Sequence, residues 1–320
     1  RNRLAPNDSL AALSSIRDRA FNLTGPGPEP LETGAESAFS ALSLDEFGVI
    51  LVADGGGEFN APGLSIHTLC GNGARLGERI ITTDDDSQLT PSDMDYDGVR
   101  GDLYISFVDT GMPTQPVGKI GIIRNFDRYL ESLIANPEDP DPLGTLLIVT
   151  PQIDPGSGVP QTAAPFGYTA IEYLPVIDQL VLATQGDPSV VEDGALHFVG
   201  DRRGAPLGTP ASLIQSSTVE VEAVLTGPAS LLGEPSDLAF DGYSLFVSDL
   251  ETVTDGVAGS LLRFGNIGSL PSDLAGDPNT APDARRGMPG AVAIVPLPDY
   301  VSGNPEVRLP EDVVATADSR

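Results

Sequence analysis

The same pattern of short apolar runs recurs four times along the chain, and this repetition restricts the possible folds more than any other feature. Each repeat contains an apolar run, a tight turn, a second apolar run that ends at or near an acidic residue, a polar loop, and a glycine followed by a third run. A fourth run follows in most repeats, as at residues 145–150 and 218–226. The repeats begin at Phe39, Pro91, Gly167 and Pro235. Four antiparallel strands in a recurring unit are typical of β-propeller blades.

The spacing of the repeats bears on the number of blades. From Asp54 to Asp249 the repeat averages about 65 residues, which is longer than the roughly 40–50 residues of compact blades. We therefore expect an all-β fold, a β-propeller of five or six four-stranded blades over residues 34–320. Residues 290–295 and the chain from 307 onward are expected to supply strands of further blades. A β-sandwich is the alternative fold.

The fourth repeat carries a resemblance to a known class of propeller. It reads Pro-Ser-Asp-Leu-Ala-Phe-Asp-Gly over residues 235–242 and Leu-Phe-Val-Ser-Asp over residues 245–249. This resembles NHL-type and related six-bladed propellers, whose blades run from a Pro-x-x-hydrophobic start through an Asp-Gly turn to a Val-x-Asp strand end. The resemblance extends over residues 39 to about 270. It implies an architecture and says little about activity, because one fold hosts many functions.

The charge of the chain limits its partners. A formal net charge of -29 arises from 46 Asp and Glu against 17 Lys and Arg, and Lys119 is the single lysine. Such a charge repels nucleic acid and anionic membrane surfaces. We therefore expect no nucleic acid partner, and we favour divalent cations or basic protein surfaces as ligands. A single cysteine, Cys70, excludes an intramolecular disulfide.

The ends of the chain inform predictions about its location. No apolar run approaches the ~20 residues that a membrane helix needs, and no signal segment opens the sequence. Because the chain begins at Arg1, we interpret it as a processed product and predict a secreted, extracellular or cell-surface protein, with the periplasm as an alternative. Residues 1–33, with a short helix at 9–19, are expected to form an N-terminal arm and linker that packs on the main domain or on a neighbour.

Recurrent aspartates suggest a metal site. In a propeller the loops between second and third strands open on one face, so strand-end aspartates should gather around one mouth of the channel. A ring of oxygen ligands suits Ca²⁺. The alternative is that each aspartate accepts backbone hydrogen bonds in its turn. Two further aspartates, Asp93 and Asp237, lie near the starts of first strands. The candidate ligands are Asp54, Asp109, Asp187 and Asp249.

The remaining residues favour binding over catalysis. The two histidines, His67 and His197, lie on third strands and are expected to be structural. The sequence contains no Gly-x-Ser-x-Gly elbow, no His-Glu-x-x-His helix and no phosphate-binding loop. We therefore predict a non-enzymatic binding, adhesion or assembly module that meets protein partners or other copies through its termini. The alternative is a Ca²⁺-dependent lactonase or esterase that resembles the gluconolactonase and paraoxonase propellers.

Overall fold

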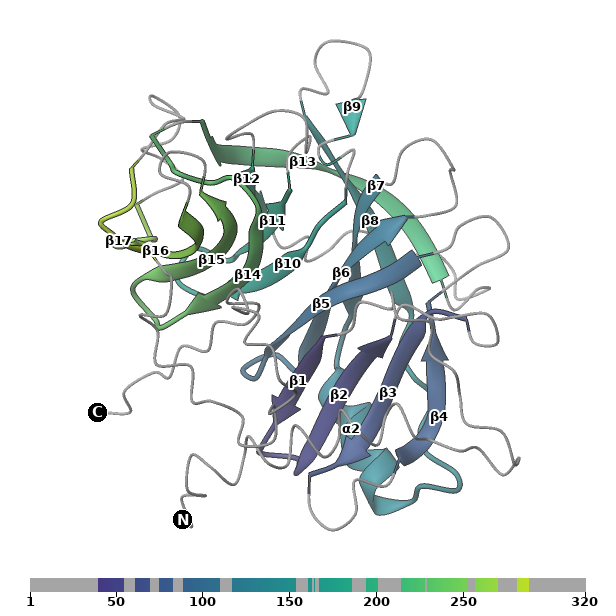
Figure 1. The fold of residues 1–320 in the computed structure, drawn as a ribbon. Helices are drawn as coiled ribbons and strands as arrows, with labels where there is room; N and C mark the ends of the chain where they lie inside the picture. Colours follow the sequence, from purple (N-terminus) through teal and green to yellow (C-terminus); the bar gives the residue numbers. More distant parts are fainter. Residues whose placement is uncertain are drawn as a thin grey trace, which may run out of the picture.

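The strands in the described part of this protein form four antiparallel units around a common axis. The computed structural model describes residues 40–54, 61–69, 75–82, 89–109, 117–153, 161–162, 164, 167–185, 194–200, 214–227, 229–252, 257–269 and 281–287. Almost all regular structure in these ranges is β-strand (Figure 1). No helix among the described residues is long and apolar enough to cross a membrane. The predicted arm at 1–33, the predicted helix within it, and the predicted strands at 290–295 and from 307 onward lie outside the described residues.

Each of the four repeats forms one four-stranded blade. Blade 1 contains β1 (Ala41–Leu44), β2 (Val49–Asp54), β3 (Gly63–Thr68) and β4 (Arg75–Ile81). Blade 2 contains β5 (Leu89–Asp97), β6 (Asp102–Asp109), β7 (Val117–Ile123) and β8 (Leu146–Ile153), with the short β9 (Gln161–Thr162) paired to β8. Blade 3 contains β10 (Ala170–Leu174), β11 (Gln179–Thr184), β12 (Ala195–Gly200) and β13 (Ile214–Thr226). Blade 4 contains β14 (Pro235–Phe240), β15 (Leu245–Thr252), β16 (Val257–Phe264) and β17 (Ala284–Gly287).

Neighbouring strands within each blade pair antiparallel in chain order. The prediction of an all-β propeller built from four-stranded blades is confirmed, and the β-sandwich alternative is not observed. The described residues hold four of the predicted blades, and any further blade falls outside them.

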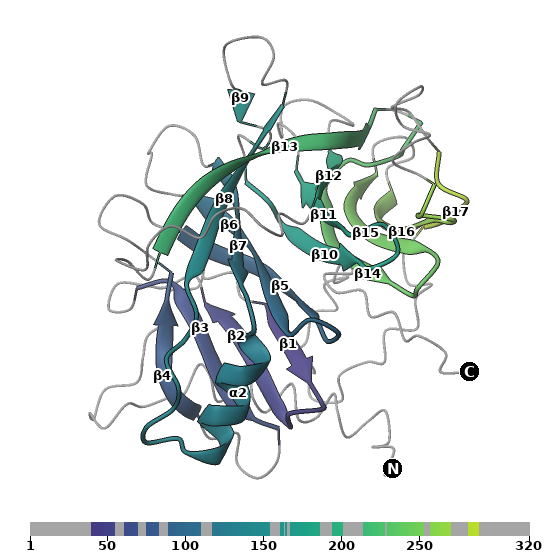
Figure 2. The same cartoon turned by 180° about the vertical axis from the view of Figure 1, so that it is seen from behind.

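The inner strands of the blades run side by side in the same direction. The backbone N–H of Ile171 in β10 donates to Asp93 of β5, and the N–H of Tyr173 donates to Asp95, so both strands advance together. The inner strand β14 packs against β10 in turn. Blades 1 to 4 therefore follow one another around the axis in chain order, as the two opposite views in Figures 1 and 2 show.

The outer strand β13 joins two blades into one sheet, which the sequence did not predict. Its second half pairs antiparallel with β12, but residues from Ile214 to Glu220 pair parallel with β8 of blade 2. The expected strand at 218–226 is therefore too short, since β13 is 13 residues long and curves from one blade to the next (Figure 2). This pairing covers the outer edge of β8, which would otherwise present unpaired backbone groups.

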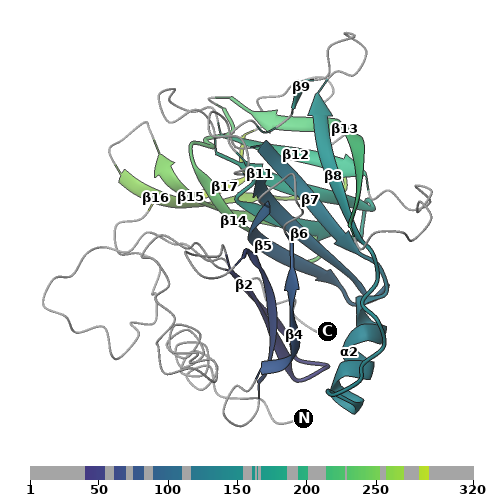
Figure 3. The same ribbon diagram turned by 90° about the vertical axis from the view of Figure 1, so that its right-hand side faces the viewer.

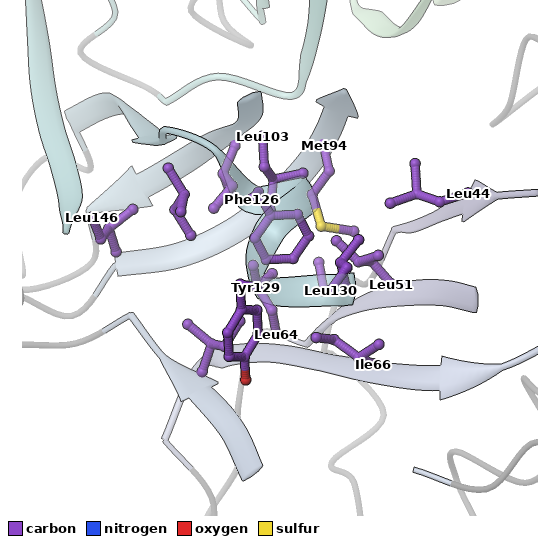
Figure 4. Close-up of a cluster of buried hydrophobic side chains, with 14 of the residues drawn as sticks. Leu44, Leu51, Leu64, Ile66, Met94, Leu103, Phe126, Tyr129, Leu130 and Leu146 are labelled. Carbon is purple, nitrogen blue, oxygen red and sulfur yellow. The ribbon is translucent and has the colours of Figure 1, made fainter. Parts of the chain in front are cut away.

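Apolar side chains fill the spaces between successive blades. One cluster lies between blades 1 and 2, a second between blades 2 and 3, and a third between blades 3 and 4. The first is enlarged by the helix α2 (Phe126–Ala135), which lies beside β4 (Figure 3). The helix buries four side chains with helical spacing, Phe126, Tyr129, Leu130 and Leu133. The first three of them are labelled in Figure 4. Sequence analysis missed this helix, although the spacing i, i+3, i+4, i+7 is its usual signature.

Replacement of a buried residue of α2 should destabilise the protein. Leu130 is fully buried in the cluster between blades 1 and 2, whereas Ile134, on the same helix, is 42% exposed. We expect Leu130→Ala to lower the free energy of unfolding by about 2–5 kcal/mol, since it leaves a cavity. The matched variant Ile134→Ala should change it by less than about 1 kcal/mol. Urea unfolding followed by circular dichroism measures both. Equal losses in the two variants would show that α2 is not anchored as described.

Candidate functional site

The inner strands of blades 2 and 4 share a bulge that positions an aspartate. The pairing of β5 with β6 shifts between Pro91 and Asp93, and the pairing of β14 with β15 shifts between Pro235 and Asp237. In both blades the serine within the bulge bonds to a serine on the second strand. The Oγ atoms are 2.8 Å apart for Ser92 and Ser106 and 2.5 Å apart for Ser236 and Ser248. The repeated Pro-Ser-Asp sequence therefore marks a β-bulge with a serine–serine hydrogen bond as well as the start of a strand.

Three carboxylates on inner strands bond to the backbone of the next blade. Asp93 Oδ2 accepts the N–H of Ile171 at 3.0 Å. Asp95 Oδ2 accepts the N–H of Tyr173 at 2.6 Å, and Glu172 Oε1 accepts the N–H of Phe240 at 3.1 Å. We call Asp93, Asp95 and Glu172 the cross-blade carboxylates. They satisfy N–H groups on the free edges of the inner strands β10 and β14, which lack a strand neighbour there.

Asp93 connects three blades. Its Oδ1 accepts a hydrogen bond of 2.8 Å from the hydroxyl of Ser40, directly before β1, while its Oδ2 faces β10. The bulge serine Ser92 extends the same junction, because its hydroxyl reaches the carbonyl oxygen of Tyr168 at 2.7 Å. This one stretch of β5 therefore fixes blade 2 against both of its neighbours.

Burial disfavours the charged form of each cross-blade carboxylate. Desolvation raises the pKa of Asp93 to about 7, opposed by the hydrogen bonds from Ile171 and Ser40. Desolvation also raises the pKa of Asp95 to about 6. The pKa of Glu172 is raised well above its usual value by burial, and the charges of Asp95 and Asp93 raise it further. The charge of Asp97 further raises the pKa of Asp95, and the charge of Asp237 further raises the pKa of Glu172.

Because of these raised pKa values, we expect stability to depend on pH. Between about pH 4, where an unfolded carboxyl titrates, and about pH 7, the folded state binds more protons than the unfolded state. The free energy of unfolding contributed by these groups should therefore fall as pH rises through this window. Asp93→Asn keeps an oxygen that can accept from Ile171 but removes one titration, so its stability should vary less with pH. Urea unfolding of both proteins between pH 4 and 8 tests this. Parallel pH profiles would contradict it.

Of the four predicted metal ligands, the structure describes one side chain. Asp249, in β15, is fully buried and accepts the N–H groups of Gly233 at 2.8 Å and Glu234 at 3.4 Å. Asp249 therefore accepts backbone hydrogen bonds, as the alternative interpretation expects, but from the segment between β13 and β14 rather than from its own turn. Asp54 and Asp109 end β2 and β6, and Asp187 lies outside the described residues. No group of three or more potential ligands is found among the described residues, and the Ca²⁺ site stays a prediction.

The aspartates also differ in register. Asp249 stands opposite Pro235, whereas Asp109 stands opposite Leu89, two residues before the corresponding Pro91. The position equivalent to Asp249 in blade 2 is Phe107, which is buried in the core. The sequence alignment of strand-end aspartates therefore does not correspond to one equivalent position in the blades.

Both histidines belong to the folded interior. His67 lies in β3, with Nε2 3.0 Å from Ser65 Oγ, and His197 lies in β12, with Nδ1 3.1 Å from Tyr168 Oη. Each is 2% exposed. Burial lowers the pKa of His197 to about 4, so it is neutral at pH 7. The structural role expected from sequence agrees with this placement.

Two of the cross-blade carboxylates were not singled out by sequence analysis. Asp95 and Glu172 lie within strands whose flanking residues are apolar or aromatic, such as Met94 and Tyr173. A charged residue inside such a run is uncommon, because a buried charge needs a partner. That mismatch is the signal by which they could have been found.

Among known proteins, solved structures match this chain at low similarity. No protein-family model matches the chain, and no curated protein matches it. A solved glucose dehydrogenase is similar at a TM-score of 0.34 and 14% identity, over 79% of this chain and 87% of that chain. A GH43_1 enzyme from Xanthomonas citri gives a TM-score of 0.24 and 12% identity, over 81% and 93%. A eukaryotic initiation factor gives a TM-score of 0.30 and 10% identity, over 79% of this chain and 55% of that chain. This chain therefore spans just over half the length of the initiation factor. These likenesses are too low to bear on function, and the propeller assignment depends on the four blades themselves.

Proposed function

We propose that this propeller is a non-enzymatic binding or assembly module, secreted or displayed at the cell surface, with an NHL-like blade design. The observation that carries the proposal is that the ionisable groups between the blades and in the core make hydrogen bonds that hold the fold together. Asp93, Asp95 and Glu172 each accept a backbone N–H from the next blade. His67 and His197 bond to neighbouring core side chains.

Groups with structural partners are poorly suited to catalysis. A general acid or base must exchange a proton with a bound substrate, within hydrogen-bond reach of the reacting atom. Reorientation of Asp95 toward a substrate would release the N–H of Tyr173 and weaken the junction between blades 2 and 3. The same holds for Glu172 at the junction of blades 3 and 4. The arrangement favours a rigid scaffold whose function lies on its surface.

The strongly acidic surface sets the kind of partner. A net charge of -29 attracts basic proteins and divalent cations. A protein partner, or other copies of the chain that meet through the termini, fits the assembly role. Ca²⁺ held by Asp54, Asp109, Asp187 and Asp249 would be compatible with this role as a stabilising ion.

The proposal predicts that the full chain does not turn over typical propeller-hydrolase substrates. We expect hydrolysis of lactones and aryl esters at the rate of buffer alone, with or without millimolar Ca²⁺. Calcium-dependent turnover that is lost in Asp249→Asn would overturn the proposal in favour of the hydrolase alternative. The stability of Asp249→Asn has to be measured alongside, because this side chain satisfies the N–H groups of Gly233 and Glu234.

Sedimentation velocity of the full chain, over a range of concentrations and salt, tests the assembly part. Association that increases with concentration supports self-assembly. A single monomeric species under all conditions would remove self-assembly and leave a heterologous partner as the binding role.

A further inference from the structure

The first hairpin of every blade ends in a turn of the same length. Four residues separate the first and second strands in all four blades. We call these turns, together, the tip face: residues 45–48, 98–101, 175–178 and 241–244. They lie at the opposite end of the strands from the loops that follow the second strands, where the sequence predicted a metal site.

Successive tips are connected to one another, the third and the fourth through residues 265–269 of blade 4. The carboxylate of Glu46 lies beside Gly98, where an added Cβ would be 3.6 Å from Oε1. Between blades 2 and 3, Arg100 Nη1 bonds to Asp178 Oδ1 at 2.5 Å. Between blades 3 and 4, Val176 lies next to Gly268, where an added Cβ would be 3.2 Å from Cγ1. The nearby N–H of Ile267 donates to the carbonyl oxygen of Tyr243.

The tip face exposes apolar side chains that the fold does not require. Val99 is 92% exposed, Tyr243 62% and Val176 59%, and these are the three most exposed large hydrophobic residues in the described part of the chain. They stand on three successive tips. Turns favour Gly, Asn, Asp, Ser and Pro, so a β-branched valine offers no benefit to the turn itself. Apolar exposure repeated on one face is typical of an interaction surface.

Acidic residues surround these apolar positions. Asp45 and Glu46 of the first tip are exposed, and Asp178 and Asp241 belong to the third and fourth. The one basic residue of the four tips, Arg100, pairs with Asp97 and Asp178. The tip face is therefore both apolar and negatively charged. A second copy of this acidic chain would be repelled there, whereas a basic partner would be attracted.

We propose that the tip face docks a basic protein segment whose apolar side chains pack on Val99, Val176 and Tyr243. This inference rests on the binding role proposed above and assigns that role to a surface. The cations of the partner face Asp45, Glu46 and the acids of the other tips, and its apolar groups cover the exposed side chains. The curved row of tips spans blades 2 to 4, which suits an extended segment that contacts one tip after another.

A synthetic peptide of alternating lysine and leucine is a suitable probe, measured by fluorescence anisotropy against the full chain at physiological salt. A lysine–serine peptide of equal charge and a glutamate–leucine peptide serve as comparisons. We expect the lysine–leucine peptide to bind and both comparisons to bind at least about tenfold more weakly, since each lacks one of the two attractions. Equal binding of the lysine–serine peptide would reduce the interaction to general charge attraction and would overturn the proposal.

Matched variants locate the binding surface. Val99→Ser, Val176→Ser and Tyr243→Ser combined should weaken peptide binding by about tenfold or more, because exposed anchors carry most of an interface's energy. The control combines Ile81→Ser, Ile134→Ser and Ile153→Ser, which replace the three other exposed large hydrophobics of the described residues, 45%, 42% and 39% exposed. It should stay within about twofold of the parent. The thermal unfolding midpoint of each protein confirms folding.

The two proposals can fail separately. Equal peptide affinity in the tip variant and the control variant would overturn the tip face as the docking surface, even if the chain shows no enzymatic turnover. Calcium-dependent hydrolysis would overturn the non-enzymatic role, whatever the peptide measurements show. Glu46→Gln combined with Asp45→Asn should weaken peptide binding and lower its dependence on salt, and an unchanged salt dependence would contradict the charge contribution.

Discussion

The inner strand of a blade has a strand neighbour on one side only, so the backbone N–H groups on its other side need partners from elsewhere. In this protein carboxylates on the preceding blade supply them, at Ile171, Tyr173 and Phe240. Each bond joins two blades at the axis, where the apolar clusters also meet. Without these acceptors, buried donors would be left unsatisfied, at about 1–3 kcal/mol each. The order and spacing of the blades depend on this satisfaction of a free edge.

This arrangement also explains why part of the acidity lies inside. A surface carboxylate maintains solubility, but Asp93, Asp95 and Glu172 serve as hydrogen-bond acceptors where water has limited access. Their mutual repulsion is the cost of placing three acids along adjacent strands. A protonated carboxyl relieves that repulsion and still offers an acceptor oxygen. The junctions formed by the cross-blade carboxylates are therefore more stable in mild acid than in alkali.

The repeats made the blade architecture predictable, because strand spacing and turn residues are local properties of the sequence. The Pro-Ser-Asp stretches located β5 and β14, and Val49 and Leu103 fell in predicted strands. The parallel pairing of β13 with β8 was not predictable, because it depends on which outer edges come together after the blades pack. The α2 helix carried a readable pattern that strand-based reasoning passed over. The site was harder: Glu172 finds its partner at Phe240, 68 residues away, and no local pattern specifies that pair.

The shared strand β13 has a mechanical consequence. Blades 1 and 2, and blades 3 and 4, are joined by packed side chains and by individual hydrogen bonds from side chains. Blades 2 and 3 are also connected by a ladder of backbone hydrogen bonds from Ile214 to Glu220. To part them, several of these bonds must break together. The weak planes of the molecule therefore lie on either side of this central pair, and a partial opening would release blade 1 or blade 4 while the double blade stays whole.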